Sequence, residues 1–277
     1  SFPTRRSSDL FTMGAFGLHG QQVVLNSRIR TGKTGKDHTE LPAELCWLRR
    51  QSCSGEELLL KEVLRFRFAK TGRAKYISHL DLVRCVQRAI RRSGLPVHYT
   101  NGFHPHMEAV FAAALPLGME SIGEILEVRF AEPVEPESAK TQLQQALPEG
   151  LELLTAYEPV HKMGELAYVR YRITLPSEQP EILLEQWQHF LEQPEVLVEK
   201  KSKRGVRTVD LLPQIDCRRA EVTEQAVMWE WMLSVGQPES VNPMLILTAF
   251  AQFAGISLEF PNFCRLQLCT KEKTEFF

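Results

Sequence analysis

The stretch 64–117 constrains the fold most, because it places strands and a helix in a fixed order. Apolar and basic side chains alternate over residues 64–68, as they do in a strand with one face in water. Ser78 and Asp81 have the spacing of a capping box, which predicts that a helix begins at Ser78. Gly94 and Pro96 predict that this helix ends near residue 93.

The rest of the chain continues this alternation of strands and helices. After the first helix, the sequence predicts a strand over 96–99 with 108–113 as its continuation, a strand over 123–130, a helix over 136–147 and a strand over 151–159. This β-α-β-β-α-β order is that of the split βαβ, or ferredoxin-like, motif. A second series follows, with strands over 168–175, 196–201, 206–211, 220–222, 226–234 and 264–269, and helices over 180–193 and 243–254.

We therefore predict an α+β fold class with two tandem ferredoxin-like (split βαβ) units, each an antiparallel sheet with helices on one face. The first unit is expected over 61–160 and the second over 166–277, because Pro159 and Gly164 break the pattern between them. A single fused sheet is the alternative architecture.

Residues 1–60 are predicted to be an artefactual or disordered leader. Residues 1–10 resemble the translation of a sequencing-adapter oligonucleotide. Residues 11–60 show no regular apolar period and mix glycine, threonine, lysine and arginine. Such a segment is expected to be disordered.

Positive charge is concentrated at the start of the first predicted unit. Residues 61–106 contain ten lysines and arginines against two carboxylates, whereas 107–165 contain three cations against eleven carboxylates. A basic helix and a basic turn near 202–205 predict two cationic surfaces for a phosphate backbone. The predicted nucleic-acid-binding residues are Lys70, Arg73, Lys75, Arg84, Arg88, Arg91, Lys200, Lys201, Lys203 and Arg204. The aromatic residues Tyr76, Tyr99 and Phe103 could stack on unpaired bases, although arginines on a helix are usually a solvated face.

Three residues are candidates for catalysis. His79 and Asp81 lie at the start of the helix, and His106 follows the next strand in a His-Pro-His sequence, so the two groups could approach each other. A histidine near a carboxylate can do general acid–base chemistry. Each residue also has a structural explanation, because Asp81 belongs to the capping box and Pro105 fixes a turn. No complete metal-ligand set is visible, and no metal or cofactor is expected in this chain.

The remaining features bear on location and on partners. No apolar run approaches the roughly 20 residues that span a bilayer, so we expect a cytoplasmic protein without a membrane partner. The six cysteines include no Cys-x3-Cys-x2-Cys triplet for an iron–sulfur cluster. Trp229 and Trp231 alternate with Glu230, which fits either a half-exposed interface or a core-facing strand.

The sequence AKTGRAKYISHLDLVRCVQRAIRRSGLPVHYTNGFHPH, followed by ALPLGMESIGEILEV, resembles the radical SAM-linked proteins, a domain of unknown function. Members of that family stand alone or form the C-terminal part of radical SAM proteins with a cobalamin-type domain. The matching positions are Lys70, Gly72, Ser78, His79, Asp81, Gly94, Gly102, Phe103, Pro105, His106, Pro116, Gly118 and Glu124. In that family a Pro and a Lys usually follow the motif histidine, whereas Met107 and Glu108 stand here, which puts a phosphate contact at this point in doubt.

This resemblance implies partnership with a radical SAM protein, and its gene context implies a substrate such as tRNA, rRNA or a ribosomal protein. Because the cluster-binding cysteines are absent, we expect an accessory domain that binds RNA or an RNA-linked substrate. The alternative is a stand-alone RNA-modifying or RNA-processing enzyme that uses His79, Asp81 and His106.

Overall fold

The computed structural model describes residues 61–202, 205–236 and 240–277 of the 277-residue chain. The chain divides into Ser1–Glu56 and Glu57–Phe277, and all of these residues belong to the second unit. The leader predicted over residues 1–60, with its adapter-like start, lies outside them. The described residues form a mixed α+β structure with four α-helices and a mostly antiparallel sheet, which confirms the predicted fold class at that level. None of these helices combines the length and apolar character needed to cross a membrane.

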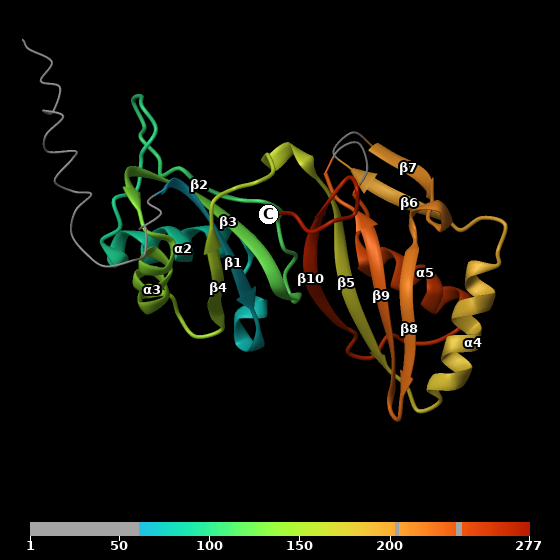
Figure 1. Cartoon of the computed structure of the whole chain (residues 1–277). Helices are drawn as coiled ribbons and strands as arrows, with labels where there is room; N and C mark the ends of the chain where they lie inside the picture. Colours follow the sequence, from blue (N-terminus) through green and yellow to red (C-terminus); the bar gives the residue numbers. More distant parts are fainter. Residues whose placement is uncertain (1–60, 203–204, 237–239) are drawn as a thin grey trace, which may run out of the picture. The chain divides into compact units, whose positions relative to one another are not determined.

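The elements follow the predicted order along the chain (Figure 1). The first half contains β1 (Lys61–Lys70), the 3-10 turn η1 (Gly72–Tyr76), α2 (His79–Ser93), β2 (Ala109–Phe111), β3 (Glu120–Val134), α3 (Pro136–Ala146) and β4 (Leu151–Tyr157). The second half contains η2 (Met163–Glu165), β5 (Leu166–Pro176), α4 (Pro180–Leu191), β6 (Leu197–Ser202), β7 (Gly205–Asp210), η3 (Leu212–Gln214), β8 (Asp216–Thr223), β9 (Ala226–Ser234), α5 (Pro243–Ala254) and β10 (Asn262–Thr270).

Strands from both halves belong to one eight-stranded sheet. Its order is β4-β1-β3-β10-β5-β9-β8, with β2 paired to β3. All pairings are antiparallel except the one between β3 and β10. The sheet is therefore fused, as in the alternative that the sequence left open. β6 and β7 form a separate two-stranded hairpin.

The two halves of the sheet join through a short contact between β3 and β10. Cys264 lies opposite Glu120, and Arg265 lies opposite Ser121. Farther along β3, residues 126–128 pair with β2. Because β1 occupies one edge of β3, the other edge is shared between β2 and β10. The joint between the halves is thus only a few residues long.

Local signals explain the bounds of α2. The Ser78 hydroxyl accepts a hydrogen bond from the Asp81 amide, and Gly94 adopts the left-handed conformation with a φ of 74°. Both features match the predicted caps. The apolar side of the helix, which includes Leu82, Val86 and Ile90, is buried against the sheet.

One predicted strand is wrong. Residues 96–99 form only isolated bridges, from Val97 to Phe130 and from Tyr99 to Met107. The chain instead turns back on itself, because the Thr100 amide donates to the His106 carbonyl at 2.9 Å. Backbone groups that a longer strand would use are therefore engaged in a local hairpin.

Each half has its own apolar core. In the second half, the rings of Trp187 and Trp231 stack at 5.2 Å, and Trp229 and Phe250 pack around them. Trp229 and Trp231 are completely buried, so the proposal that they form a half-exposed interface is wrong. Aromatic side chains at alternate positions of β9 point into the core because successive strand residues face opposite sides.

A buried arginine fixes the chain's last residues to the first half. Arg65 lies on β1, is 1% exposed, and donates hydrogen bonds to the carbonyl oxygens of Phe277 and His161 at 2.7 and 2.6 Å. Its Nε also donates to the Glu127 carboxylate at 2.9 Å. Tyr157 on β4 contacts the ring of Phe277 edge-on.

Because the hydroxyl of Tyr157 is largely buried, we expect the protein to lose stability at high pH. Burial raises the pKa of Tyr157 to about 12. In the unfolded chain the phenol ionises near its ordinary pKa of about 10, so proton loss favours the unfolded state between these two pH values. We expect the urea midpoint of the wild type to fall more steeply above pH ~10 than that of Tyr157→Phe. Parallel pH profiles for the two proteins would contradict this expectation.

The close packing around Gly123, at the joint between the halves, leads to a second prediction about stability. A Cβ at this position would lie only 2.3 Å from the Leu266 carbonyl oxygen, so a side chain requires the two strands to separate. Overpacking of this kind typically costs about 1–3 kcal/mol. We expect Gly123→Ala to lower the free energy of unfolding in urea by at least that amount. Gly164→Ala is the matched control, because a Cβ there would meet no atom within 4 Å.

Candidate functional site

The exposed side of α2 carries a row of arginines. We call these residues, Arg84, Arg88, Arg91 and Arg92, together with Arg73 of η1, the basic face; all five are exposed. Arg84, Arg88 and Arg91 are spaced four and three residues apart, so they lie on one side of the helix. This side is opposite the buried apolar residues of α2. The helix therefore presents its arginines from a support that is packed against the sheet.

Some of these arginines have partners and others do not. Arg84 pairs with Asp81 at 3.0 Å, and Arg92 donates to the Ala146 carbonyl at 2.6 Å. Hydrogen bonds from Ser78 and then Arg84 lower the pKa of Asp81. The side chains of Arg73, Arg88 and Arg91 make no hydrogen bond or ion pair with any other residue that the structure describes. Their charges are available to a ligand.

The two predicted lysines of the first half differ from these arginines. Lys75 is partly buried, lies 3.6 Å from the Glu120 carboxylate and contacts the ring of Tyr76. Lys70 is completely buried. The prediction that Lys70 lies on a nucleic-acid-binding surface is therefore wrong, because its ammonium group points into the protein rather than into solvent.

The second predicted basic surface is only partly described. Lys200 lies on β6, and its ammonium group donates to the Ser240 carbonyl oxygen. Lys203 and Arg204 lie outside the described residues, as does the side chain of Lys201. A role for this turn in nucleic-acid binding remains a prediction.

The candidate catalytic residues occupy separate environments. His79 packs its ring against Phe111 at 5.7 Å, and its buried Nδ1 has no partner among the described residues. Asp81 is exposed and bonded to Ser78 and Arg84. His106 is also exposed, and its Nδ1 lies 3.0 Å from the Thr100 hydroxyl. The contacts of His106 are with its own hairpin, so the structure does not bring it to His79 and Asp81.

No group of three or more histidine, cysteine, aspartate or glutamate side chains within 61–202, 205–236 and 240–277 is arranged to hold a metal ion.

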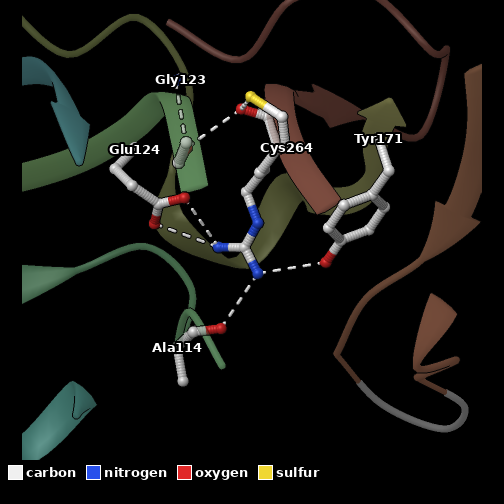
Figure 2. Close-up of polar contacts among 7 residues, drawn as sticks. Ala114, Gly123, Glu124, Tyr171 and Cys264 are labelled. Atoms are coloured by element: carbon white, nitrogen blue, oxygen red, sulfur yellow. Dashed lines mark hydrogen bonds and ion pairs between the residues drawn. The ribbon is translucent and has the colours of Figure 1, made fainter. Parts of the chain in front are cut away.

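A buried cluster of charges lies where the halves of the sheet join. In Figure 2, Glu124, Ala114 and Tyr171, which come from both halves, surround one guanidinium group, that of Arg265. Its Nη1 is 3.0 Å from both oxygens of Glu124, and its Nη2 donates to the Ala114 carbonyl and the Tyr171 hydroxyl at 3.0 and 3.1 Å. Arg265 and Glu124 are each 1% exposed. Burial alone would lower the pKa of Arg265, but Glu124 and Tyr171 outweigh it and raise that pKa.

The backbone at this joint is bonded through the same residues. The Ser121 hydroxyl donates to the Arg265 carbonyl at 3.1 Å and accepts from the Gly123 amide at 3.2 Å. Ser121 is completely buried. Side chain and backbone of Arg265 therefore both hold β10 against β3.

Lys70 connects this cluster to the start of α2. Its ammonium group donates to the carbonyl oxygens of Lys75 and Ile77 at 3.1 and 2.8 Å. Burial lowers the pKa of Lys70, the charge of Glu124 opposes this effect, and Arg265 adds to it. We call Lys70, Glu124 and Arg265 the buried cluster. It contains two cations and one carboxylate, and it fixes the chain that leads into the N-terminal cap of α2.

The buried cluster was only partly visible in the sequence. Lys70 and Glu124 are positions of the recognised motif, but nothing local marks Arg265 as their partner 141 residues after Glu124. The ion pair of Glu108 with His98 and Arg129, at 3.0 Å each, was also missed. Both join segments that are separated in the sequence, which a local pattern does not report.

Glu124 is expected to be the most sensitive member of the buried cluster. Glu124→Gln leaves Lys70 and Arg265 buried without a counter-charge, whereas Arg265→Met leaves the carboxylate beside Lys70. Breaking a buried pair costs about 3–5 kcal/mol. We expect both variants to lose free energy of unfolding of this order, with the larger loss for Glu124→Gln.

Arg172→Met is the control for this experiment. Arg172 pairs with Glu230 at 3.2 Å on a neighbouring strand but is 44% exposed, so its loss should cost about 0–1 kcal/mol. The comparison uses urea unfolding of all three variants. If the Glu124→Gln protein is as stable as Arg172→Met, the buried charges of Lys70 and Arg265 do not require the carboxylate for stability, which would contradict the prediction.

Comparison with known protein families identifies the family of the chain. Residues 63–243 match the model of a family described as an uncharacterized protein conserved in bacteria, DUF2344. The match covers the basic face, Lys70 and Glu124, whereas Arg265 lies beyond it. No curated protein matches the chain.

Proposed function

The chain belongs to the DUF2344 family, and we propose that it binds RNA or an RNA-linked substrate through the basic face, as an accessory domain for a radical SAM enzyme. The observation that carries this proposal is the row of exposed arginines on the basic face, of which Arg73, Arg88 and Arg91 have no partner among the described residues. In the second half, by contrast, several exposed cations are paired, as Arg172 is with Glu230 and Lys273 with Asp216. A row of arginines with a single carboxylate, Asp81, beside it favours binding of phosphate groups.

The geometry of α2 supports this role. At a rise of about 1.5 Å per residue, the row from Arg84 to Arg91 is about 10 Å long, enough to contact several phosphates of one strand. The helix is held by its caps and its buried side, so the backbone that carries the arginines is ordered before a ligand binds. Tyr76, before α2 in the sequence, and Tyr99, after it, have exposed side chains that provide aromatic surfaces for bases.

The proposal of a radical SAM partner rests on the resemblance of the motif over residues 70–124 to the radical SAM-linked proteins. Several motif residues build the support of the basic face: Ser78, Asp81 and Gly94 cap α2, and Lys70 and Glu124 belong to the buried cluster. A motif that maintains this helix fits a domain whose role is to present a binding surface to a substrate shared with a partner enzyme.

We further propose that the two halves are related ferredoxin-like units. In the first half the strand order is β4-β1-β3-β2, and in the second it is β10-β5-β9-β8. Both have the order and antiparallel pairing of a split βαβ unit. In this interpretation the β6–β7 hairpin is an insertion between α4 and β8.

Charge reversal of the basic face tests RNA binding. We expect the triple variant Arg84→Glu, Arg88→Glu, Arg91→Glu to bind a labelled tRNA at least about tenfold more weakly, because each lost phosphate contact removes a counterion-release contribution. The slope of log affinity against log salt concentration should become shallower by about 2 for three lost contacts to a single strand. Both quantities are measurable by fluorescence anisotropy.

The matched control reverses three exposed cations of the second half, Arg218→Glu, Arg219→Glu and Lys271→Glu. This variant has the same net charge as the first. Equal loss of binding in both variants would show that net charge, rather than the basic face, attracts RNA, and unchanged binding in the first would remove the basic face from the proposal.

A further inference from the structure

A hairpin follows directly from the end of α2. Residues 98–108, which we call the 98–108 hairpin, turn at Asn101 and Gly102 and carry Phe103 beyond the turn. The phenyl ring of Phe103 is fully exposed, whereas Phe66, Phe68 and Phe130 in the same half are buried. Burial of such a side chain is worth about 1.5–3 kcal/mol, and the fold forgoes it here.

The 98–108 hairpin is held in place at several levels. Near the tip, the His106 amide donates to the Thr100 hydroxyl at 3.1 Å, in addition to the bond between the Thr100 amide and the His106 carbonyl. At the base, the Glu108 amide donates to the His98 carbonyl at 3.1 Å. The ring of Phe103 is therefore carried by a hairpin whose two arms are joined by hydrogen bonds.

The base of the hairpin is also tied to the sheet. The His98 amide donates to the carbonyl of Arg129 on β3 at 2.9 Å, and the Glu108 carboxylate contacts both of these side chains at 3.0 Å. The charge of Glu108 is thus compensated by Arg129. This arrangement fixes the direction in which the hairpin leaves the sheet.

The charge around Phe103 indicates what it could contact. Residues 94–107 contain no carboxylate, and the tip offers the Asn101 amide and the imidazoles of His104 and His106. In the sequence, Arg91 and Arg92 in the last turn of α2 come a few residues before the hairpin. An exposed π face with hydrogen-bond donors around it, in a segment free of carboxylates, is complementary to an unpaired nucleobase.

We propose that Phe103 stacks on an unpaired base of an RNA whose backbone lies on the basic face, so that the substrate is a single-stranded or looped RNA region rather than a continuous duplex. This inference rests on the proposed function. In a duplex the bases are already stacked on each other, and no base face is free for Phe103.

Binding of a short RNA that contains one 2-aminopurine tests this proposal, with the RNA either alone or annealed to its complement. Stacking on an aromatic ring is worth about 1–3 kcal/mol per base, so Phe103→Ala should bind the single strand about tenfold more weakly. Phe103→Trp should retain binding and change the 2-aminopurine fluorescence. Duplex binding should be equal for wild type and Phe103→Ala.

The matched control is Phe260→Ala. Phe260 is 91% exposed but follows Glu259 in the second half, so it shares the exposure of Phe103 without a segment free of carboxylates around it. Its replacement should leave single-strand binding unchanged. Because both phenylalanines are exposed, neither variant should lower the thermal midpoint.

The outcomes separate this inference from the proposed function. If the wild type binds neither RNA, the proposed function fails and the stacking role fails with it. If the wild type binds RNA and Phe103→Ala binds the single strand equally well, only the stacking role is overturned. A Phe103→Ala variant with normal RNA binding that no longer binds a purified protein partner would assign the hairpin to protein docking, which also overturns it.

Discussion

The ion pair between Arg265 and Glu124 is the interaction on which the rest of the structure depends. β3 and β10 share only two paired positions, so backbone hydrogen bonds alone give the joint little area. Arg265 adds contacts to Glu124, to the Ala114 carbonyl and to the Tyr171 hydroxyl, and thereby connects three segments from both halves (Figure 2). Such a pair is weak evidence of net stability, because desolvation offsets the attraction. Its value here is specificity, since only one register of β10 places the guanidinium beside the carboxylate.

The same cluster determines where the candidate RNA-binding surface lies. Lys70 holds the backbone of Lys75 and Ile77, directly before the cap of α2 at Ser78. The Lys75 carbonyl also accepts from the Gly118 amide, in the segment whose Ala114 carbonyl accepts from Arg265. The start of α2 and the 112–119 segment are therefore positioned by common contacts. This continuity physically couples the joint between the halves to the orientation of the basic face.

The sequence predicted the elements whose signals are local. Ser78 and Asp81 mark the start of α2 and Gly94 marks its end, each by a local signal, and their hydrogen bonds and backbone angles are as expected. Lys70 was misassigned because a lysine at the end of a strand is usually exposed, and its compensation comes from Glu124 and from two carbonyl groups that the sequence does not reveal. Arg265 could not be connected to Glu124, because the pairing of β10 with β3 depends on long-range strand order. The alternation of Trp229 and Trp231 was compatible with two environments, and the packing of Trp187 decided between them.

The contrast between Lys70 and the arginines of α2 shows how one run of cations can serve two purposes. Lys70 lies at the end of β1, where its buried charge is enclosed by backbone acceptors, and it stabilises the turn that leads to the helix. Arg84, Arg88 and Arg91 lie on the outer side of that helix, where water solvates them and a ligand can replace the water. The presence of a cation in this motif therefore does not show that the residue lies on the binding surface. Secondary structure divides it into cations that build the support and cations that the support presents.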